Sequence, residues 1–71
     1  MKIITITTEF IKLQDLLKFA NLVETGGEAK ERIQAGEVTV VGEVCTMLGK
    51  KILPGDDVCF HGEHYTVTYA D

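Results

Sequence analysis

Apolar and polar positions alternate at the start of the chain in the pattern of a half-buried strand. Within residues 2–7, Ile4 and Ile6 point one way and Thr5 and Thr7 the other, which is the period of two that a strand requires. The same period returns in three later segments, at residues 38–40, 57–61 and 65–69. All four segments are therefore predicted to be strands.

A helical period follows the first strand. Leu13, Leu16, Leu17 and Ala20 fall at i, i+3, i+4 and i+7 and so share one stripe. Polar side chains occupy the opposite side. The stripe covers only two turns, so we expect packing rather than intrinsic propensity to hold this helix.

A second helix is predicted to begin after Thr25. Thr25 and Glu28 stand three residues apart, the spacing of a capping box, in which each side chain binds a backbone N–H left free where a helix begins. Ala29 and Ile33 form the predicted inner face. Gly36 stands where a left-handed residue would end the helix.

Glycines mark three turns in the second half of the chain. Valine is unfavourable at positive φ, so in the turn at residues 41–43 we expect Gly42 rather than Val41 to take that conformation. Pro54–Gly55 suits the central positions of a type II turn, and another turn is expected at residues 62–63. The order of elements predicts an α+β fold, with two short N-terminal helices packed on one face of a small, mainly antiparallel β-sheet.

Length and charge narrow the function classes. Seventy-one residues suffice for one domain, spanning 1–71, with a thin core and a surface site. The net charge of −4 excludes a domain that is basic all over, but not one with a local basic face. Two cysteines are too few for a disulfide scaffold, and we find neither a membrane span nor a signal peptide. We therefore expect a cytoplasmic protein.

Four segments in order resemble the RNA-binding domain named after small-subunit ribosomal protein S-four. They are residues 13–17, 25–30, 36–40 and 55–58, which match the family's first helix, its second helix with an Ala, its Gly-x-Val-x-Val strand and its Gly-Asp-x-Val strand. The resemblance covers about residues 11–67 and is greatest to the small stand-alone YaaA/YbcJ-type members, in which the domain is the whole protein. It implies the S-four-like (αL-motif) fold and binding to structured RNA, either ribosomal RNA or tRNA, with ribosome association.

The resemblance also implies where RNA would bind. Carried over position by position, the family's surface gives Lys30 on the second helix and Lys50 and Lys51 on the loop before the Gly-Asp strand, with Arg32 as a fourth candidate. This chain departs from the family at three places. Gly26 replaces an arginine, Val41–Gly42 replaces the usual Asn-Gly or Asp-Gly turn, and Met47–Leu48 stands where close relatives carry arginines.

Two interpretations of the basic residues remain open. Lysine and arginine neutralise phosphates and release counterions, so four such contacts predict a steep salt dependence. Alternatively, all four are ordinary solvated charges on a helix and a loop, with Glu28 and Glu31 close enough to pair with Lys30 and Arg32 within one helical turn. The glycine pair at residues 26–27 has two interpretations of its own. It exposes helix N–H groups to a phosphate, or it meets a need for unusual φ or close packing.

Other chemistry is less well supported. Cys59, His61 and His64 offer three metal-ligand types, but the spacing matches no standard zinc module, and an exposed hairpin explains them better. We identify no metal site, no cofactor site and no catalytic set, so we expect no enzyme. Phe19 and Phe60 are predicted to lie in the core, whereas Phe10 and residues 47–48 have no clear place in it.

Two functions follow from these patterns. The first is a non-catalytic RNA-binding module that uses Lys30, Arg32, Lys50, Lys51 and the glycines Gly26 and Gly27. The alternative is a protein-interaction adaptor that keeps the fold but has lost RNA binding, with a protein partner at Met47 and Leu48. The acidic net charge and the missing arginines support the alternative.

Overall fold

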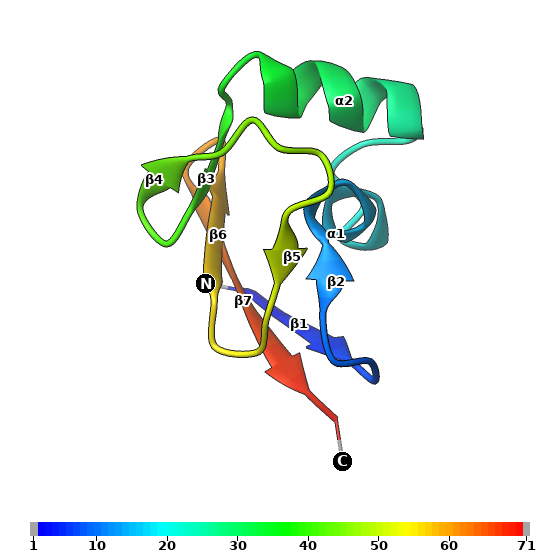
Figure 1. The fold of residues 1–71 in the computed structure, drawn as a ribbon, viewed down its shortest axis with the longest axis vertical. Helices are drawn as coiled ribbons and strands as arrows, with labels where there is room; N and C mark the ends of the chain where they lie inside the picture. The colour runs from blue at the N-terminus through cyan, green and yellow to red at the C-terminus, as the bar shows by residue number, and fades with distance from the viewer. Residues whose placement is uncertain (1, 71) are drawn as a thin grey trace.

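A mixed five-stranded sheet, two helices and a separate two-stranded ladder make up the fold (Figure 1). The structure is a computed structural model and describes residues 2–70. The strands are β1 (Lys2–Ile6), β2 (Ile11–Lys12), β3 (Val38–Val40), β4 (Glu43–Val44), β5 (Lys51–Ile52), β6 (Asp57–Phe60) and β7 (Glu63–Tyr69), and the helices are α1 (Leu13–Phe19) and α2 (Gly26–Gln34). The predicted α+β class is confirmed.

The main sheet has the strand order β1-β7-β6-β3-β4. The pairing is antiparallel between β7 and β6, between β6 and β3, and between β3 and β4. The pairs β6–β7 and β3–β4 are hairpins, which join antiparallel strands by a short turn. β1 instead pairs parallel with β7, with Ile4 opposite Val67. The first and last strands of the described chain therefore lie side by side in the sheet.

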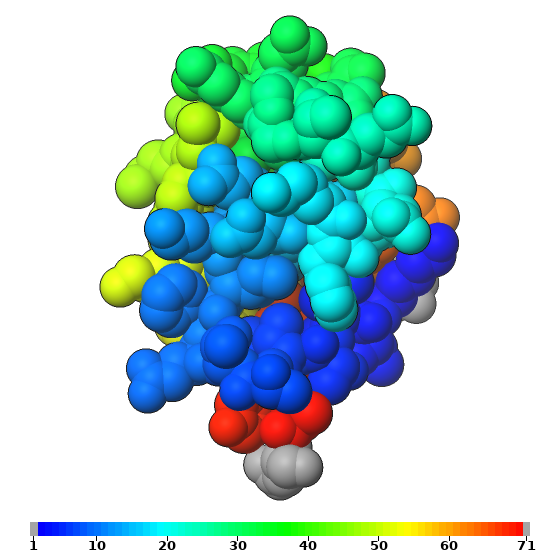
Figure 2. Space-filling view, turned by 90° about the vertical axis from the view of Figure 1, so that its right-hand side faces the viewer, coloured from blue at the N-terminus to red at the C-terminus, as the bar shows by residue number. Residues whose placement is uncertain are grey.

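Both helices cover the same face of this sheet. Leu13, Leu16 and Leu17 of α1 and Ala29 and Ile33 of α2 are completely buried, as the helical periods predicted. Ile4 and Ile6 of β1 are also buried, and their threonine neighbours lie on the other side. Figure 2 shows the helical side, on which α2 (green) lies above α1 and the N-terminal segment (dark blue) lies below them.

Local signals at the ends of α2 act as predicted. The hydroxyl of Thr25 accepts a hydrogen bond from the backbone N–H of Glu28 at 3.1 Å. The carboxylate of Glu28 reaches back one residue further than in the usual capping box and accepts from the N–H of Glu24 at 2.8 Å. At the other end Gly36 has φ +79°, and the N–H groups of Gly36 and Glu37 bind the last carbonyls of the helix, which is a Schellman ending.

The turns differ from the prediction in two places. Val41 itself takes φ +50°, beside Gly42 at +84°, and His61 takes φ +50° beside Gly62 at +83°. Both pairs therefore form the two-residue turn that best suits the twist of a β-hairpin, so the expectation that Val41 would avoid positive φ was wrong. The turn after β6 also begins one residue earlier than predicted. Gly55, at φ +97°, takes the predicted type II position.

The three phenylalanines lie in three different environments. Phe60 is buried, as predicted, but Phe19 is 62% exposed. The prediction for Phe19 was wrong because Phe19 is the last residue of α1 and lies off the buried leucine stripe. Phe10 is half-buried, just before β2.

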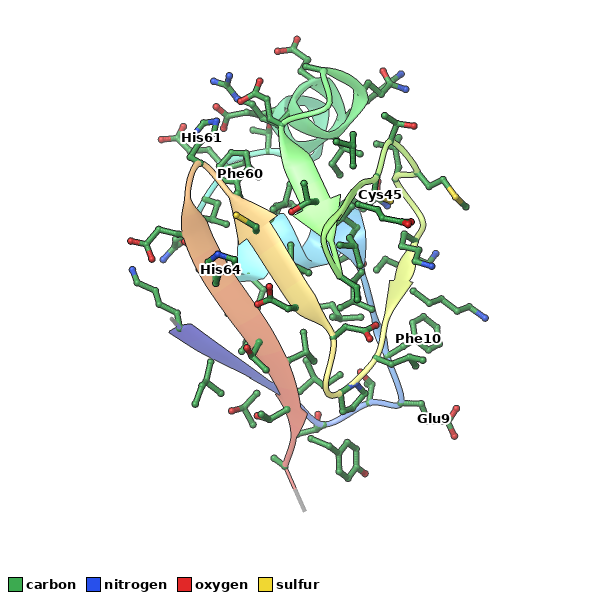
Figure 3. The ribbon with its side chains drawn as sticks, turned by 90° about the vertical axis from the view of Figure 1, so that its left-hand side faces the viewer. Glu9, Phe10, Cys45, Phe60, His61 and His64 are labelled. Carbon is green, nitrogen blue, oxygen red and sulfur yellow. The ribbon has the colours of Figure 1, made fainter. Side chains whose placement is uncertain are left out.

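Within residues 2–70, no helix covers the second face of the sheet. Figure 3 shows β6 and β7 from this side, with His64 on the open face. No helix within residues 2–70 is long and apolar enough to cross a membrane.

Candidate nucleic-acid interface

The loop that carries Lys50 is attached to the beginning of helix α1. No side chain caps α1. Its first two backbone N–H groups instead donate to the carbonyl oxygens of the loop, Leu13 to Lys50 at 2.9 Å and Gln14 to Leu48 at 3.2 Å. Since these N–H groups have no partner inside the helix, the loop satisfies them and is itself held in place.

Directly after this loop, β5 pairs with β2 in a two-residue antiparallel ladder. Ile11 lies opposite Ile52, and Lys12 lies opposite Lys51. Ile52 is buried, whereas both lysines are exposed. Two like charges are thus held face to face on neighbouring strands, an arrangement that costs free energy.

Within residues 2–70, neither Lys12, Lys50 nor Lys51 forms an ion pair. The ammonium of Lys51 lies instead over the ring of Phe10, 4.9 Å from its centre. We call Lys12, Lys50 and Lys51 the ladder lysines. They place three positive charges on and directly before the strands of the β2–β5 ladder, in a protein whose net charge is −4.

Lys12 was not recognised from the sequence. Nothing in its immediate neighbourhood distinguishes it from an ordinary surface lysine. It joins the predicted pair at residues 50–51 only because β2 and β5 meet, although almost forty residues separate them in the chain. A predicted pairing between these strands would have been the signal that placed it there.

Helix α2 holds the other two predicted basic residues, in a different electrostatic setting. Arg32 lies between two carboxylates, 3.3 Å from Glu37 and 3.9 Å from Glu28. The predicted pairing with Glu28 is therefore present. Lys30 is exposed and forms no ion pair within the described part of the chain. Figure 1 places α2 at one end of the long axis, away from the β2–β5 ladder, so the structure gathers Lys50 and Lys51 but not Lys30 and Arg32 with them.

The glycine pair at the beginning of α2 is open to solvent. A Cβ added at Gly26 would meet nothing within 4 Å, and one at Gly27 would meet only the Thr25 hydroxyl, at 3.8 Å. Neither glycine has positive φ. Close packing and unusual backbone conformation therefore do not account for the pair, and its backbone is accessible from outside.

A groove of about 680 Å³ borders Lys50 and Lys51. Four apolar side chains that are between 51% and 65% exposed line it, namely Val41, Val44, Met47 and Leu53. Glu43 and Asp56 also line it, so the groove has mixed polarity. Leu48, predicted to share a surface with Met47, packs partly against the core instead.

The residues considered for a metal do not converge. Cys59 and His64 face each other across β6 and β7, but His64 binds Asp57 at 2.9 Å. His61 lies in the turn, stacked on Phe60, and its Nε2 binds Glu37 at 2.5 Å. Within residues 2–70 no group of three histidine, cysteine or acidic side chains could hold a metal ion.

Glu37 connects α2 to the β6–β7 hairpin. The hydrogen bond from His61 lowers the pKa of Glu37 below its usual value, and Arg32 lowers it further, while partial burial acts in the opposite direction. Arg32 and Glu37 thus belong to a network that joins three elements. The guanidinium of Arg32 has a partner inside the protein before any ligand arrives.

Two short helices on one face of a mixed sheet, with a loop docked on the first helix, define the αL-motif class of α+β fold. A sequence model of the S4 domain matches residues 4–68. The chain belongs to the S4 domain family, as the resemblance in its four segments predicted.

Two proteins illustrate the similarity. YbcJ from E. coli, whose solution structure is described as revealing an αL motif involved in RNA-binding, superposes with a TM-score of 0.72 and 35% sequence identity. The match covers 96% of this chain and 87% of YbcJ. A protein of Bacillus subtilis (strain 168) named probable ribosome maturation protein RlbA is 39% identical over 59 residues, which is 83% of each chain.

Proposed function

We propose that this chain is a non-catalytic RNA-binding protein that binds structured RNA, either ribosomal RNA or tRNA, through a local basic face. Its family, the RNA-binding motif described for YbcJ and the ribosome maturation role in the name of the Bacillus subtilis relative support this proposal. Association with the ribosome and a cytoplasmic location are parts of the same proposal.

The observation that carries the proposal is the group of ladder lysines. Lys12 and Lys51 are held opposite each other, Lys50 is next to them, and none of the three is neutralised within residues 2–70. A phosphate backbone would supply ion-pair partners to these lysines. Binding would release the counterions condensed on the RNA, which is the main source of affinity in such contacts.

Helix α2 extends the proposed interface. Lys30 is a fourth cation without an ion-pair partner in the described chain, and the accessible backbone at Gly26 and Gly27 suits a phosphate. Arg32 contributes less in this proposal, because a phosphate would compete for it with Glu28 and Glu37. Four phosphate contacts correspond to a slope of log K against log salt of about −3 to −4.

The experiment is a binding titration against ribosomal RNA and tRNA at about 50 mM and about 200 mM salt, over which the affinity should fall by about a hundredfold. The double variant Lys50→Glu/Lys51→Glu should lose most of the binding at low salt. The loss should be similar for all RNA sequences, since phosphate contacts carry no sequence information.

Two lysines outside the ladder provide a control with the same net charge. Lys2→Glu/Lys18→Glu changes the total charge equally, and the surface pair of Lys18 with Asp15 contributes little to stability. If both double variants bind RNA equally well, the ladder lysines are not the interface. Loss in the ladder variant alone would support it.

The groove supports one alternative, a protein-interaction adaptor. Met47, Val44 and Leu53 expose apolar surface that a protein partner would cover. This function predicts no RNA binding even at low salt, and a partner complex whose affinity barely depends on salt. Met47→Ser should weaken that complex, whereas the RNA-binding function gives Met47 no part in the interface, so the two functions are separable.

A further inference from the structure

The surface beside the ladder contains one feature that phosphate binding does not need, which is the aromatic ring of Phe10. Phe10 comes directly before β2 and is half-buried. Its backbone carbonyl accepts a hydrogen bond from the hydroxyl of Thr8 at 2.7 Å. In Figure 3 its side chain lies beside β5 at the edge of the molecule, while Glu9 leaves the loop in another direction.

The ring lies under one ladder lysine and is close in sequence to another. Lys51 covers Phe10 at 4.9 Å from the ring centre, and Lys12, the next residue but one after Phe10, faces Lys51 across the ladder. The strand pairing fixes the backbone of both lysines. An aromatic face and two ammonium groups are therefore presented together, without a carboxylate paired to either lysine in residues 2–70.

We infer that Phe10, Lys12 and Lys51 form a binding site for one unpaired nucleotide of the RNA, with its base stacked on Phe10 and its phosphate between the two lysines. This inference rests on the proposed function and specifies its substrate class, namely structured RNA that contains a bulge or loop. Base stacking on an aromatic ring is stronger than the exposed cation–π contact that it would replace.

The exchange also removes the repulsion within the ladder. Once the base occupies the ring, the ammonium of Lys51 is free to bind the phosphate with Lys12. The two like charges then share one anion instead of facing each other uncompensated. A fully paired duplex offers its phosphates to the same lysines but keeps its bases in the stack, so it cannot use Phe10.

The test compares two RNA probes of equal length at about 50 mM salt, a perfectly paired stem and the same stem with a three-nucleotide bulge. The protein should bind the bulged stem about tenfold more tightly, in the range of one stacked base. Phe10→Leu should abolish this preference while leaving the affinity for the duplex and the salt slope unchanged, since no charge is removed. Phe10→Trp should keep the preference.

Phe19→Leu is the matched control, because it makes the same change at an aromatic ring that is 62% exposed and has no lysine over it. The thermal unfolding midpoint of each variant confirms that it folds. A bulge that contains 2-aminopurine should change its fluorescence on binding to the parent protein, and should not do so with Phe10→Leu.

The outcomes separate the two claims. If the parent binds both probes with a steep salt slope and Phe10→Leu changes neither affinity, the stacking site is refuted and the proposed function stands. If the parent binds neither probe at low salt, both claims fail. If Phe19→Leu lowers the preference for the bulge as much as Phe10→Leu does, the ring of Phe10 has no specific role and the inference is overturned.

Discussion

Helix α2 and the β2–β5 ladder both carry basic residues, but the surroundings of those residues differ. On α2, Arg32 forms ion pairs with Glu28, one helical turn earlier, and with Glu37, just after the helix ends. In the ladder, Lys12 and Lys51 have each other as neighbours and no carboxylate as partner in the described chain. A positive charge in the sequence is therefore available to a ligand only where the fold leaves it uncompensated.

The difference between the ladder and α2 should have its largest effect on the affinity for RNA. Lys12→Gln removes a charge without an internal partner, so affinity at low salt should fall about tenfold, as expected for one charged hydrogen bond. The salt slope should fall by about one. Arg32→Gln removes an equal charge that the protein already neutralises, so its loss should be smaller in the same titration. Equal losses of RNA affinity in the two variants would show that the ladder and α2 do not differ in this way.

The turn beside the ladder should give the next largest effect, in stability. Val41 is β-branched, 65% exposed and held at φ +50°, a conformation that costs about 1–2 kcal/mol outside glycine and asparagine. Val41→Asn should therefore raise the free energy of unfolding by about 1 kcal/mol in chemical denaturation. Val44 is also exposed but has negative φ. Val44→Asn should bring no such gain, and a similar gain would show that backbone strain is not the cause.

A smaller effect is expected on the free energy of unfolding, and its sign should differ between the ladder and α2. Lys12→Gln removes a cross-strand repulsion and should stabilise the fold by about 0.2–1 kcal/mol. Arg32→Gln removes exposed ion pairs and should destabilise it by up to about 1 kcal/mol. Chemical denaturation at low and at high salt measures the change in the free energy of unfolding for each variant. Both changes should be smaller at high salt, which screens the charges. Destabilisation by Lys12→Gln would contradict an uncompensated ladder.

The last effect concerns acid stability. Folding lowers the pKa of Glu37 from about 4.5 through its contacts with His61 and Arg32, so ionised Glu37 stabilises the folded state. This contribution is complete above the unfolded pKa and disappears as the pH falls through the lower folded pKa. Glu37→Gln should therefore flatten the dependence of the unfolding midpoint on pH below about 4.5. Glu43→Gln, which removes a carboxylate from an exposed site in β4, is the matched control for the loss of charge.

The elements that depend on neighbours within a few residues were predicted well. The leucine stripe of α1, the Thr25 cap and the Gly36 ending of α2 are present at the predicted positions. Phe19 was misplaced because it lies off the buried leucine stripe of α1. Val41 was misjudged because the twist of the paired strands β3 and β4 outweighs the preference of a single residue.

The proposed site was predicted only in part. Lys50 and Lys51 were identified through the family resemblance, and the contacts of their loop with α1 were not foreseen, since backbone hydrogen bonds between distant segments leave no local pattern. Lys12 was missed altogether. Its partner is on β5, and a two-residue strand such as β2 is too short for its period to be recognised.

The sequence by itself therefore determined the local conformations and the family. Hydrophobic period, caps and glycine turns act between residues that are close in the chain, so their effects can be predicted from the order of residues. The tertiary structure decided that β1 pairs with β7, that the loop before β5 caps α1, and that Lys12 meets Lys51. These contacts join residues far apart in the chain, and the packing of the whole core selects them.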